Sequence, residues 1–384
     1  MSTPTPAEEW TAHRREQQRQ ALGEDLCRFR ELIAALGSGE RSGRALSRAE
    51  AGEALDHLLD GRCTDAQAGA FLIAHRLRRP EPQELAGMLD SYRRRGPRLG
   101  AIPRRVVSFG VPFDGRVRSA PLLPLLALLL AAAGAGVVLH GGGPMPVKYG
   151  LSTAETLAAL DLDLRDLPWS EAQQLFAQEG LALMHQPRHF PEAERLVPIR
   201  EQIGKRPPIA TLELLWSCYE GPCLQVSGFV HAPTEGLAWE ALSTAGQDDV
   251  LMVKGGEGGV ELPNSRVAIA SHRRGGVPER LILRARNHGL GAPEVALETL
   301  PQWRSQAHQA LRATGPLARG LLWNGGFLLW RAGIRDNLEE GLLLAERLLR
   351  DGAVENLHRQ LIARLALRPG GRPPAEPPPD PAGC

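Results

Sequence analysis

Two glycine-rich loops carry the clearest chemical signal in this sequence. The first follows an apolar stretch at 106–108 and reads Gly110-Val111-Pro112-Phe113-Asp114-Gly115-Arg116. The second ends an apolar stretch at 137–140 and reads His140-Gly141-Gly142-Gly143, and Lys148 and a capped helix start at Ser152 come after it. Glycines let backbone N–H groups approach an anion, and a helix N-terminus adds a favourable dipole. These loops predict a crevice for an anion or a sugar phosphate, although the same glycines also suit ordinary turns.

Such loops need an α/β sheet to bring them together, and the rest of the chain predicts one. From residue 101 to 367, short Val/Leu/Ile runs alternate with helical segments, which is typical of an α/β domain with a central mixed sheet. We expect strands at 106–108, 137–140, 181–185, 225–230, 250–253 and 267–270. We expect helices near 120–133, 153–160, 170–179, 192–203, 236–245, 300–313 and 335–350.

The part before residue 101 reads as helical. Residues 1–40 form a charged extension, helical from about 10 to 36, and 37–43 form a flexible break. Residues 41–100 hold a small helical domain of three short helices, two of them begun by capping boxes at Ser47 and Thr64. Three short helices bury little surface, so we expect this unit to pack on the main domain or on a second copy. Residues 93–103 read as a hinge, and 368–384 form a Pro-rich tail that is disordered by composition.

Composition and charge set limits on the class of protein. The chain has 384 residues with 43% hydrophobic content, which favours two domains. The chain has 45 Lys and Arg against 44 Asp and Glu, a formal net charge of +1. So small a charge gives no indication that nucleic acid or a membrane is a partner. The five scattered cysteines fit reduced cytosolic thiols, and the single C-x4-C pair argues against zinc.

The location expected from sequence is the cytoplasm. The charged N-terminus lacks the pattern of a signal peptide. The one long apolar run, 122–139, is interrupted by Pro124, Gly134 and Gly136, so it reads as a helix plus a buried strand and not as a membrane span.

The order of these motifs resembles a known family. The capped helices and the two glycine loops are followed by Pro187-Arg188-His189-Phe190, by Val197-Pro198-Ile199-Arg200 and by Gly204-Lys205-Arg206. Over about 45–355 this succession resembles the anthranilate phosphoribosyltransferase family of tryptophan biosynthesis, within the nucleoside phosphorylase and phosphoribosyltransferase fold. It is similar to a divergent branch found in cyanobacteria. The resemblance implies a pentosyl glycosyltransferase, a homodimer formed through the helical domain, and Arg200 as the contact to an acceptor carboxylate.

The family's phosphate motifs are degraded here. The Gly-Thr-Gly-Gly-Asp loop keeps only Gly110 and Asp114, with Pro112, which has no N–H, between them. The family's Asn-x-Ser-Thr falls in 120–125, where no polar side chain remains. Lys-His-Gly-Asn-Arg becomes 139–143 without its cation, and Ser-Ser-Lys-Ser-Gly becomes 146–150, which keeps Lys148 as a point charge.

The family's magnesium-binding Asp-Glu pair corresponds to the segment 254–261, where Lys254 and Glu257 stand among glycines. Magnesium is possible by resemblance, but the acids that would anchor it are absent. Lys254 and Glu257 then serve another ligand or form a salt-bridged turn. The predicted substrate- and phosphate-binding residues are Gly110, Asp114, Gly115, Arg116, His140, Gly141, Gly142, Gly143, Lys148, Arg200, Lys254 and Glu257, with no catalytic residue and no metal ligand assigned.

Two functions remain open from sequence. The first is transfer of a (phospho)ribosyl group from a pyrophosphorylated sugar to an unknown acceptor. The second is a non-catalytic protein that binds an anionic small molecule or single-stranded nucleic acid. For nucleic acid, Arg93–Arg95, Arg116, Arg118, Arg273 and Arg274 are the candidate phosphate contacts.

Overall fold

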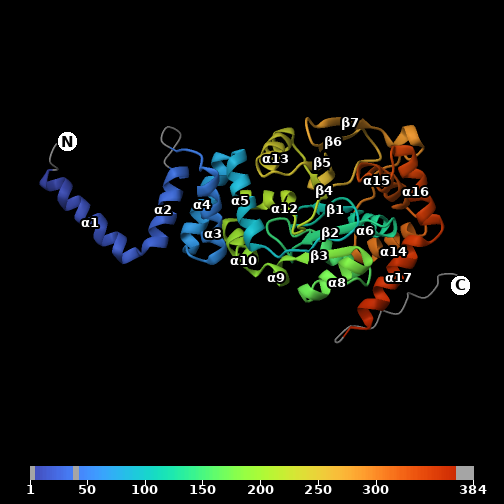
Figure 1. Ribbon diagram of the computed structural model, residues 1–384, viewed down its shortest axis with the longest axis horizontal. Helices are drawn as coiled ribbons and strands as arrows, with labels where there is room; N and C mark the ends of the chain where they lie inside the picture. Colours follow the sequence, from blue (N-terminus) through green and yellow to red (C-terminus); the bar gives the residue numbers. More distant parts are fainter. Residues whose placement is uncertain (1–4, 38–42, 369–384) are drawn as a thin grey trace.

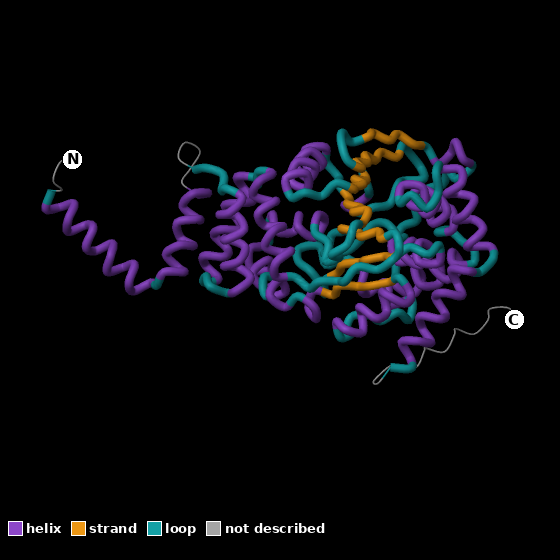
Figure 2. Tube along the Cα trace, in the orientation of Figure 1, coloured by secondary structure: helices purple, strands orange, loops and turns teal. Residues whose placement is uncertain are grey.

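The computed structural model describes residues 5–37 and 43–368 and shows helices at one end and a sheet wrapped by helices at the other (Figure 1, Figure 2). The helical end consists of α1 (Pro6–Leu22), α2 (Glu24–Gly37), α3 (Arg48–Asp60), α4 (Asp65–Arg78) and α5 (Pro82–Arg95). Within the described ranges, no helix combines the length and apolarity needed to cross a membrane. The predicted fold class, a helical domain joined to a larger α/β domain with a mixed sheet, is confirmed.

The sheet has seven strands in the order β3-β2-β1-β4-β5-β6-β7. β1 (Val106–Gly110), β2 (Gly136–Gly141), β3 (Leu181–His185), β4 (Cys223–Gly228) and β5 (Asp249–Val253) are parallel, and β6 (Ala268–Arg274) and β7 (Glu279–Leu283) are added antiparallel at one edge. The carboxyl ends of the five parallel strands therefore lie along one edge of the sheet, where α/β folds place ligands.

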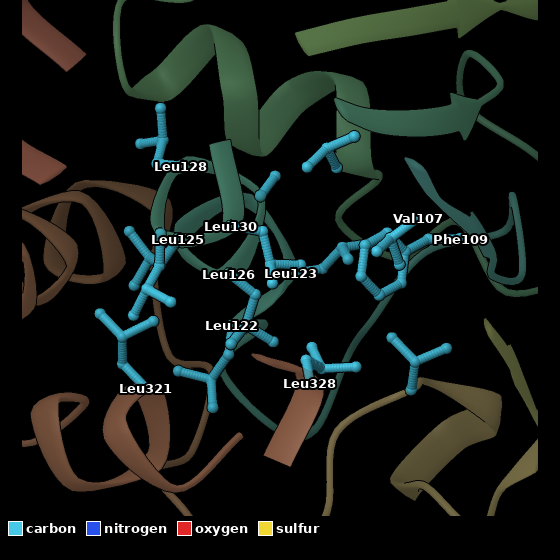
Figure 3. Packing of buried hydrophobic residues seen from close by; sticks show 14 of the residues in the cluster. Val107, Phe109, Leu122, Leu123, Leu125, Leu126, Leu128, Leu130, Leu321 and Leu328 are labelled. Atoms are coloured by element: carbon cyan, nitrogen blue, oxygen red, sulfur yellow. The ribbon is translucent and has the colours of Figure 1, made fainter. Parts of the chain in front are cut away.

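One face of the sheet packs on leucine-rich helices. The long apolar run forms α6 (Leu123–Ala132), whose residues are almost all buried, followed by strand β2. Figure 3 shows the α6 leucines gathered with Val107 and Phe109 of β1 and with Leu321 and Leu328 of α15 (Ala318–Arg331). α14 (Leu300–Leu311), α16 (Leu338–Arg350) and α17 (Ala353–Ala366) complete this layer. The run 122–139 is thus a buried helix and strand, as the sequence predicts.

The other face packs on the helical domain. Val106, Val138 and Met252 point to this side and share one apolar cluster with Phe71 of α4 and Leu89 of α5. α13 (Ala232–Thr244) lies against α5, and α12 (Leu212–Leu215) lies between α5 and the strands. The helical unit therefore buries its apolar faces on the main domain of the same chain. The homodimer stays a prediction.

The remaining helices connect these layers. They are α7 (Thr153–Ala159), α8 (Trp169–Glu179), α9 (Gln186–His189), α10 (Pro191–Glu194) and α11 (Val197–Ile203), with short 3₁₀ turns η1 (Pro208–Thr211), η2 (Gly256–Gly258) and η3 (Ala285–His288). The helix expected at 192–203 is two helices, α10 and α11, and the strand expected at 225–230 begins and ends two residues earlier. β7, α15 and α17 have no counterpart in the sequence prediction.

The charged extension contains two helices and not one. Gly23, with φ +87°, ends α1. α1 buries no residue, whereas α2 buries Phe29 and Leu32. The predicted break at 37–43 and the predicted disorder of the tail fall mostly on 38–42 and 369–384, which lie outside the described residues.

Candidate functional site

The loops that follow β1, β2 and β5 meet at the carboxyl edge of the sheet. Arg116 and Leu151 exchange two backbone hydrogen bonds of 2.8 and 2.9 Å, and Gly150 N–H donates to the Asp114 carbonyl. Glu257, from the loop after β5, reaches the backbone of residues 117–119. Asp114, Gly115, Arg116, Lys148 and Glu257 are thereby brought together.

The glycines of the first loop permit close packing of one chain segment on another. A Cβ on Gly110 would lie 1.9 Å from the Leu214 carbonyl oxygen. Gly115 has φ +74°, and a Cβ there would lie 2.4 Å from the Gly150 carbonyl oxygen. In the second loop, a Cβ on Gly142 would meet Met145, while Gly141 and Gly143 have ordinary surroundings. Gly110 and Gly115 thus have a structural reason to be glycine, independent of any ligand.

Glu257 accepts hydrogen bonds from several backbone donors at once. Its carboxylate accepts from the N–H of Val117 at 3.1 Å, of Arg118 at 3.0 Å and of Ser119 at 3.3 Å. Burial raises the pKa of this carboxyl, but the bonds from Val117 and Arg118 and the charges of Lys148 and Arg116 outweigh burial and lower the pKa to about 2. Glu257 is therefore an ionised carboxylate held where consecutive backbone donors converge, an arrangement that binds anions.

Each cation of this crevice faces a protein carboxylate. Arg116 donates to Glu261 at 2.8 Å and lies 3.6 Å from Glu257. Lys148 lies 3.4 Å from Glu257 and 3.9 Å from Asp114.

A second set of ion pairs is centred on the Glu213 carboxylate. Arg200 is only 3% exposed and donates to Glu213 at 2.5 Å and to the Pro146 carbonyl at 3.2 Å. Arg206 lies 3.8 Å from Glu213 and 3.9 Å from Asp114. We name the whole set the paired crevice: Arg116, Lys148, Arg200 and Arg206 with Asp114, Glu213, Glu257 and Glu261. Its four cations and four carboxylates balance.

His140 lies beneath the crevice and not in it. Its ring is 1% exposed, with Nδ1 3.1 Å from the Phe109 carbonyl oxygen and Nε2 accepting from Cys218 N–H at 3.3 Å. Burial lowers the pKa of His140 to about 4, so the ring is neutral at pH 7. The structure leaves no ring nitrogen of His140 free for a ligand.

The other predicted cations are dispersed. Lys254 is exposed and has no ion pair among the described residues. Arg93 donates to the Ala245 carbonyl, Arg94 pairs with Asp56, and the buried Arg273 lies over the Trp239 ring. These arginines do not form one basic stripe with Arg116, which lies inside the paired crevice.

The residues at the place of the family's magnesium pair do not fit that ion. Glu257 accepts from three backbone N–H groups, and Glu261 accepts from Arg116 and from Leu122 N–H at 3.2 Å. Carboxylates whose oxygens face N–H donors and cations are poor ligands for a divalent cation. Among the residues that the structure describes, no three His, Cys, Asp or Glu side chains are grouped to hold a metal.

Beside the paired crevice, a cavity of about 900 Å³ opens between α4 and the carboxyl ends of β4 and β5. Its polar wall includes Arg76, Arg79, Arg206 and His231, and its apolar wall includes Pro112 and Phe229. Arg76 donates to the Arg206 carbonyl, and neither Arg76 nor Arg79 has an ion pair within 5–37 and 43–368. Sequence reasoning missed Arg76 and Arg79, because basic residues at the end of a helix are common on any surface. It also missed His231, a single histidine just before α13 that belongs to no motif.

Comparison with known proteins identifies the family. Residues 30–96 match the helical bundle domain of a glycosyl transferase family, and residues 124–355, more than half of the chain, match its a/b domain. An anthranilate phosphoribosyltransferase from Methylobacterium nodulans is 31% identical over 84% of this chain and 95% of its own length. An uncharacterized protein from Aquifex aeolicus is 25% identical over 79% of this chain and 93% of its own length.

Solved structures agree on the fold. Anthranilate phosphoribosyltransferase from Thermus thermophilus superposes with a TM-score of 0.70 at 23% identity, over 88% of this chain and 98% of that one. The Saccharomyces cerevisiae enzyme in complex with PRPP and Mg superposes with a TM-score of 0.73 at 16% identity, over the same shares. The chain therefore belongs to the glycosyl transferase family of the anthranilate phosphoribosyltransferase type, as its motifs suggest.

Proposed function

We propose that this chain binds an anionic small molecule of the sugar-phosphate class in the cavity beside the paired crevice, and that it does so without magnesium-dependent transfer chemistry. The observation that carries the proposal is the contrast between the two neighbouring regions. The crevice has its cations neutralised by carboxylates, whereas the cavity presents Arg76 and Arg79 without acidic partners.

The cavity has the size and the wall chemistry for such a ligand. About 900 Å³ lies within the range of small-molecule sites. Phe229, Leu237 and several prolines offer an apolar surface to a ring. Arg76, Arg79 and the start of α13 at Ala232 offer positive potential to phosphate groups. The Saccharomyces cerevisiae enzyme, which shares this fold, has been solved in complex with PRPP and Mg, and PRPP belongs to this ligand class.

The absence of transfer follows from the paired crevice. Departure of pyrophosphate needs positive groups aimed at the charge that develops on it. Here Arg116 and Lys148 already face Glu261 and Glu257, and the acids present do not fit magnesium.

The second candidate is the family's own type of reaction, transfer of a (phospho)ribosyl group from a pyrophosphorylated sugar to an acceptor. One observation favours it: the cavity adjoins the same sheet edge as the paired crevice, with Glu257 and Gly258 in its wall. A donor bound at this edge would have an acceptor space next to it.

Isothermal titration calorimetry with PRPP, ribose 5-phosphate and pyrophosphate tests the binding proposal. We expect binding that Arg76→Ala and Arg79→Ala each weaken by about 1.5–3 kcal/mol, the contribution of a hydrogen bond to a charged group. Arg350→Ala, at an arginine on α16 whose side chain is 71% exposed, is the matched control and should change nothing. Equal affinity in wild type and in both cavity variants would refute the cavity as the site.

Incubation of the protein with PRPP, magnesium and a panel of acceptors, followed by measurement of released pyrophosphate, separates the two candidates. The first predicts no release above the rate without protein. Release that depends on the acceptor would establish the second.

A further inference from the structure

The donors around Glu257 are those of an anion site, and a side chain of this chain occupies it. Three consecutive backbone N–H groups, at Val117, Arg118 and Ser119, converge on one carboxylate at 3.0–3.3 Å. Lys148 Nζ and Arg116 Nε lie 3.4 and 3.6 Å from the same carboxylate. Successive N–H groups with flanking cations are the arrangement by which proteins hold phosphate.

We propose that Glu257 is an internal substitute for a phosphate group, and that it closes a latent phosphate or pyrophosphate site formed by the backbone of 117–119, Lys148 and Arg116. An external anion must displace the Glu257 carboxylate before it can use these donors. Glu257 itself lies in the wall of the cavity assigned above, but the donors of the latent site are other residues, and the inference does not depend on what that cavity binds.

The loop that carries Glu257 is built so that its side chain can leave. Gly255, Gly256, Gly258 and Gly259 flank it on both sides. Glu257 itself has φ +55°, a backbone conformation that residues other than glycine and asparagine adopt rarely. That backbone conformation is strained. Part of the free energy gained from the contacts of the Glu257 carboxylate with 117–119, Lys148 and Arg116 therefore offsets the strain. A Cβ on Gly256 would meet nothing closer than 3.9 Å, so the chain has space next to Glu257.

The neighbouring acids do not share this role. Glu261 accepts from Arg116 and from the N–H of Leu122, so it receives a single backbone donor. Asp114 lies 3.9 Å from each of Lys148 and Arg206, beyond hydrogen-bond distance. Glu257 is the carboxylate of the paired crevice that collects consecutive backbone donors.

The test removes the internal anion and measures binding of inorganic pyrophosphate at pH 7.5 and low salt. Glu257→Gly and Glu257→Asn suit the experiment because both residues accept φ +55°. We expect wild type to bind pyrophosphate weakly and both variants to bind it roughly 10- to 100-fold more tightly, the change that one charge-assisted hydrogen bond produces. Glu346→Asn, at a half-buried acid on α16, is the control for general loss of negative charge and should behave as wild type.

Two further measurements identify the donors. Lys148→Ala in the Glu257→Asn background should abolish most of the gain. Hydrogen exchange should show the amides of 117–119 less protected in Glu257→Asn than in wild type, with protection restored by pyrophosphate.

Folded variants with the pyrophosphate affinity of wild type overturn the proposal, and so does wild type that binds as tightly as the variants. Failure of the cavity proposal is recognised separately, because Arg76→Ala and Arg79→Ala do not touch these donors.

Discussion

Replacing Arg200 should lower the free energy of unfolding, and the structure indicates by how much. Arg200→Met keeps an unbranched, mostly apolar side chain and removes the guanidinium group with its charge. Glu213, which is 5% exposed, then keeps Phe113 N–H at 2.9 Å as a donor and Arg206 at 3.8 Å as a cation. Breaking a buried ion pair by removing one partner costs about 3–5 kcal/mol, because the other charge stays buried.

We expect the lower end of that range, about 3 kcal/mol, since Arg206 still screens the carboxylate. The assay is urea unfolding followed by circular dichroism, with the first transition compared between proteins because a chain with two domains need not unfold in one step. Arg350→Met, in an exposed pair on α16, is the control and should stay within about 0.5 kcal/mol of wild type. Adding Glu213→Gln to Arg200→Met should recover part of the loss. A single variant as stable as wild type would show that Glu213 does not need Arg200 and would leave this arginine free for a ligand.

Three other predictions concern buried groups. Because the pKa of Glu257 is lowered to about 2, its contribution to stability is fully present above its ordinary pKa of 4.5 and is lost as pH falls toward 2. The melting temperatures of wild type and Glu257→Gln should therefore converge as pH falls from about 4.5 to about 2. The pKa of His140 is lowered to about 4, so its contribution to stability is present above its ordinary pKa of 6.5 and declines as pH falls from 6.5 toward 4. His140→Leu should flatten the dependence of melting temperature on pH in that range, and it should cost about 1–3 kcal/mol for each backbone group left unpaired. Phe71 is fully buried against Phe29, so Phe71→Asp should destabilise the helical domain by several kcal/mol in thermal melts, and an unchanged melting temperature would contradict this packing.

The parallel part of the sheet could be predicted because its strands are buried on both faces and read as short apolar runs. β1, β2 and β3 were located to within two residues on that basis. The sequence analysis did not predict β7, because this strand lies at the sheet edge. Glu279, Arg280 and Ile282 are exposed there, and the apolar pattern is lost. The single helix expected at 10–36 was wrong in one respect, since Gly23 alone was too weak a signal for a break.

Sequence spacing assigns the candidate residues to loops that follow strands, but it does not predict how their charged side chains pair. Spacing put Lys148 after the strand now seen as β2 and Glu257 after the strand now seen as β5, and although β1 and β4 lie between these strands, the structure brings the two side chains within 3.4 Å. Nothing in the sequence indicates that Glu213, about a hundred residues from Phe113, bonds to its N–H and neutralises Arg200. Side-chain partners of this kind depend on how loops pack in three dimensions, and sequence spacing carries no information on that.

The balance of charge in the paired crevice has a consequence for how fast ligands arrive. Four cations facing four carboxylates within a few ångströms form a set of short dipoles, and the field of such a set falls off steeply with distance. An approaching phosphate would feel little attraction from the crevice until it is at contact, since the fields of opposite charges only a few ångströms apart largely cancel. Salt screens what remains over a Debye length of about 10 Å at 0.1 M. Its encounter rate with the crevice should therefore lack electrostatic steering and vary little with ionic strength, in contrast to enzymes whose clefts carry one sign of charge. Under the proposal for Glu257, selection among anions would then take place after they have arrived, by which of them can replace the carboxylate.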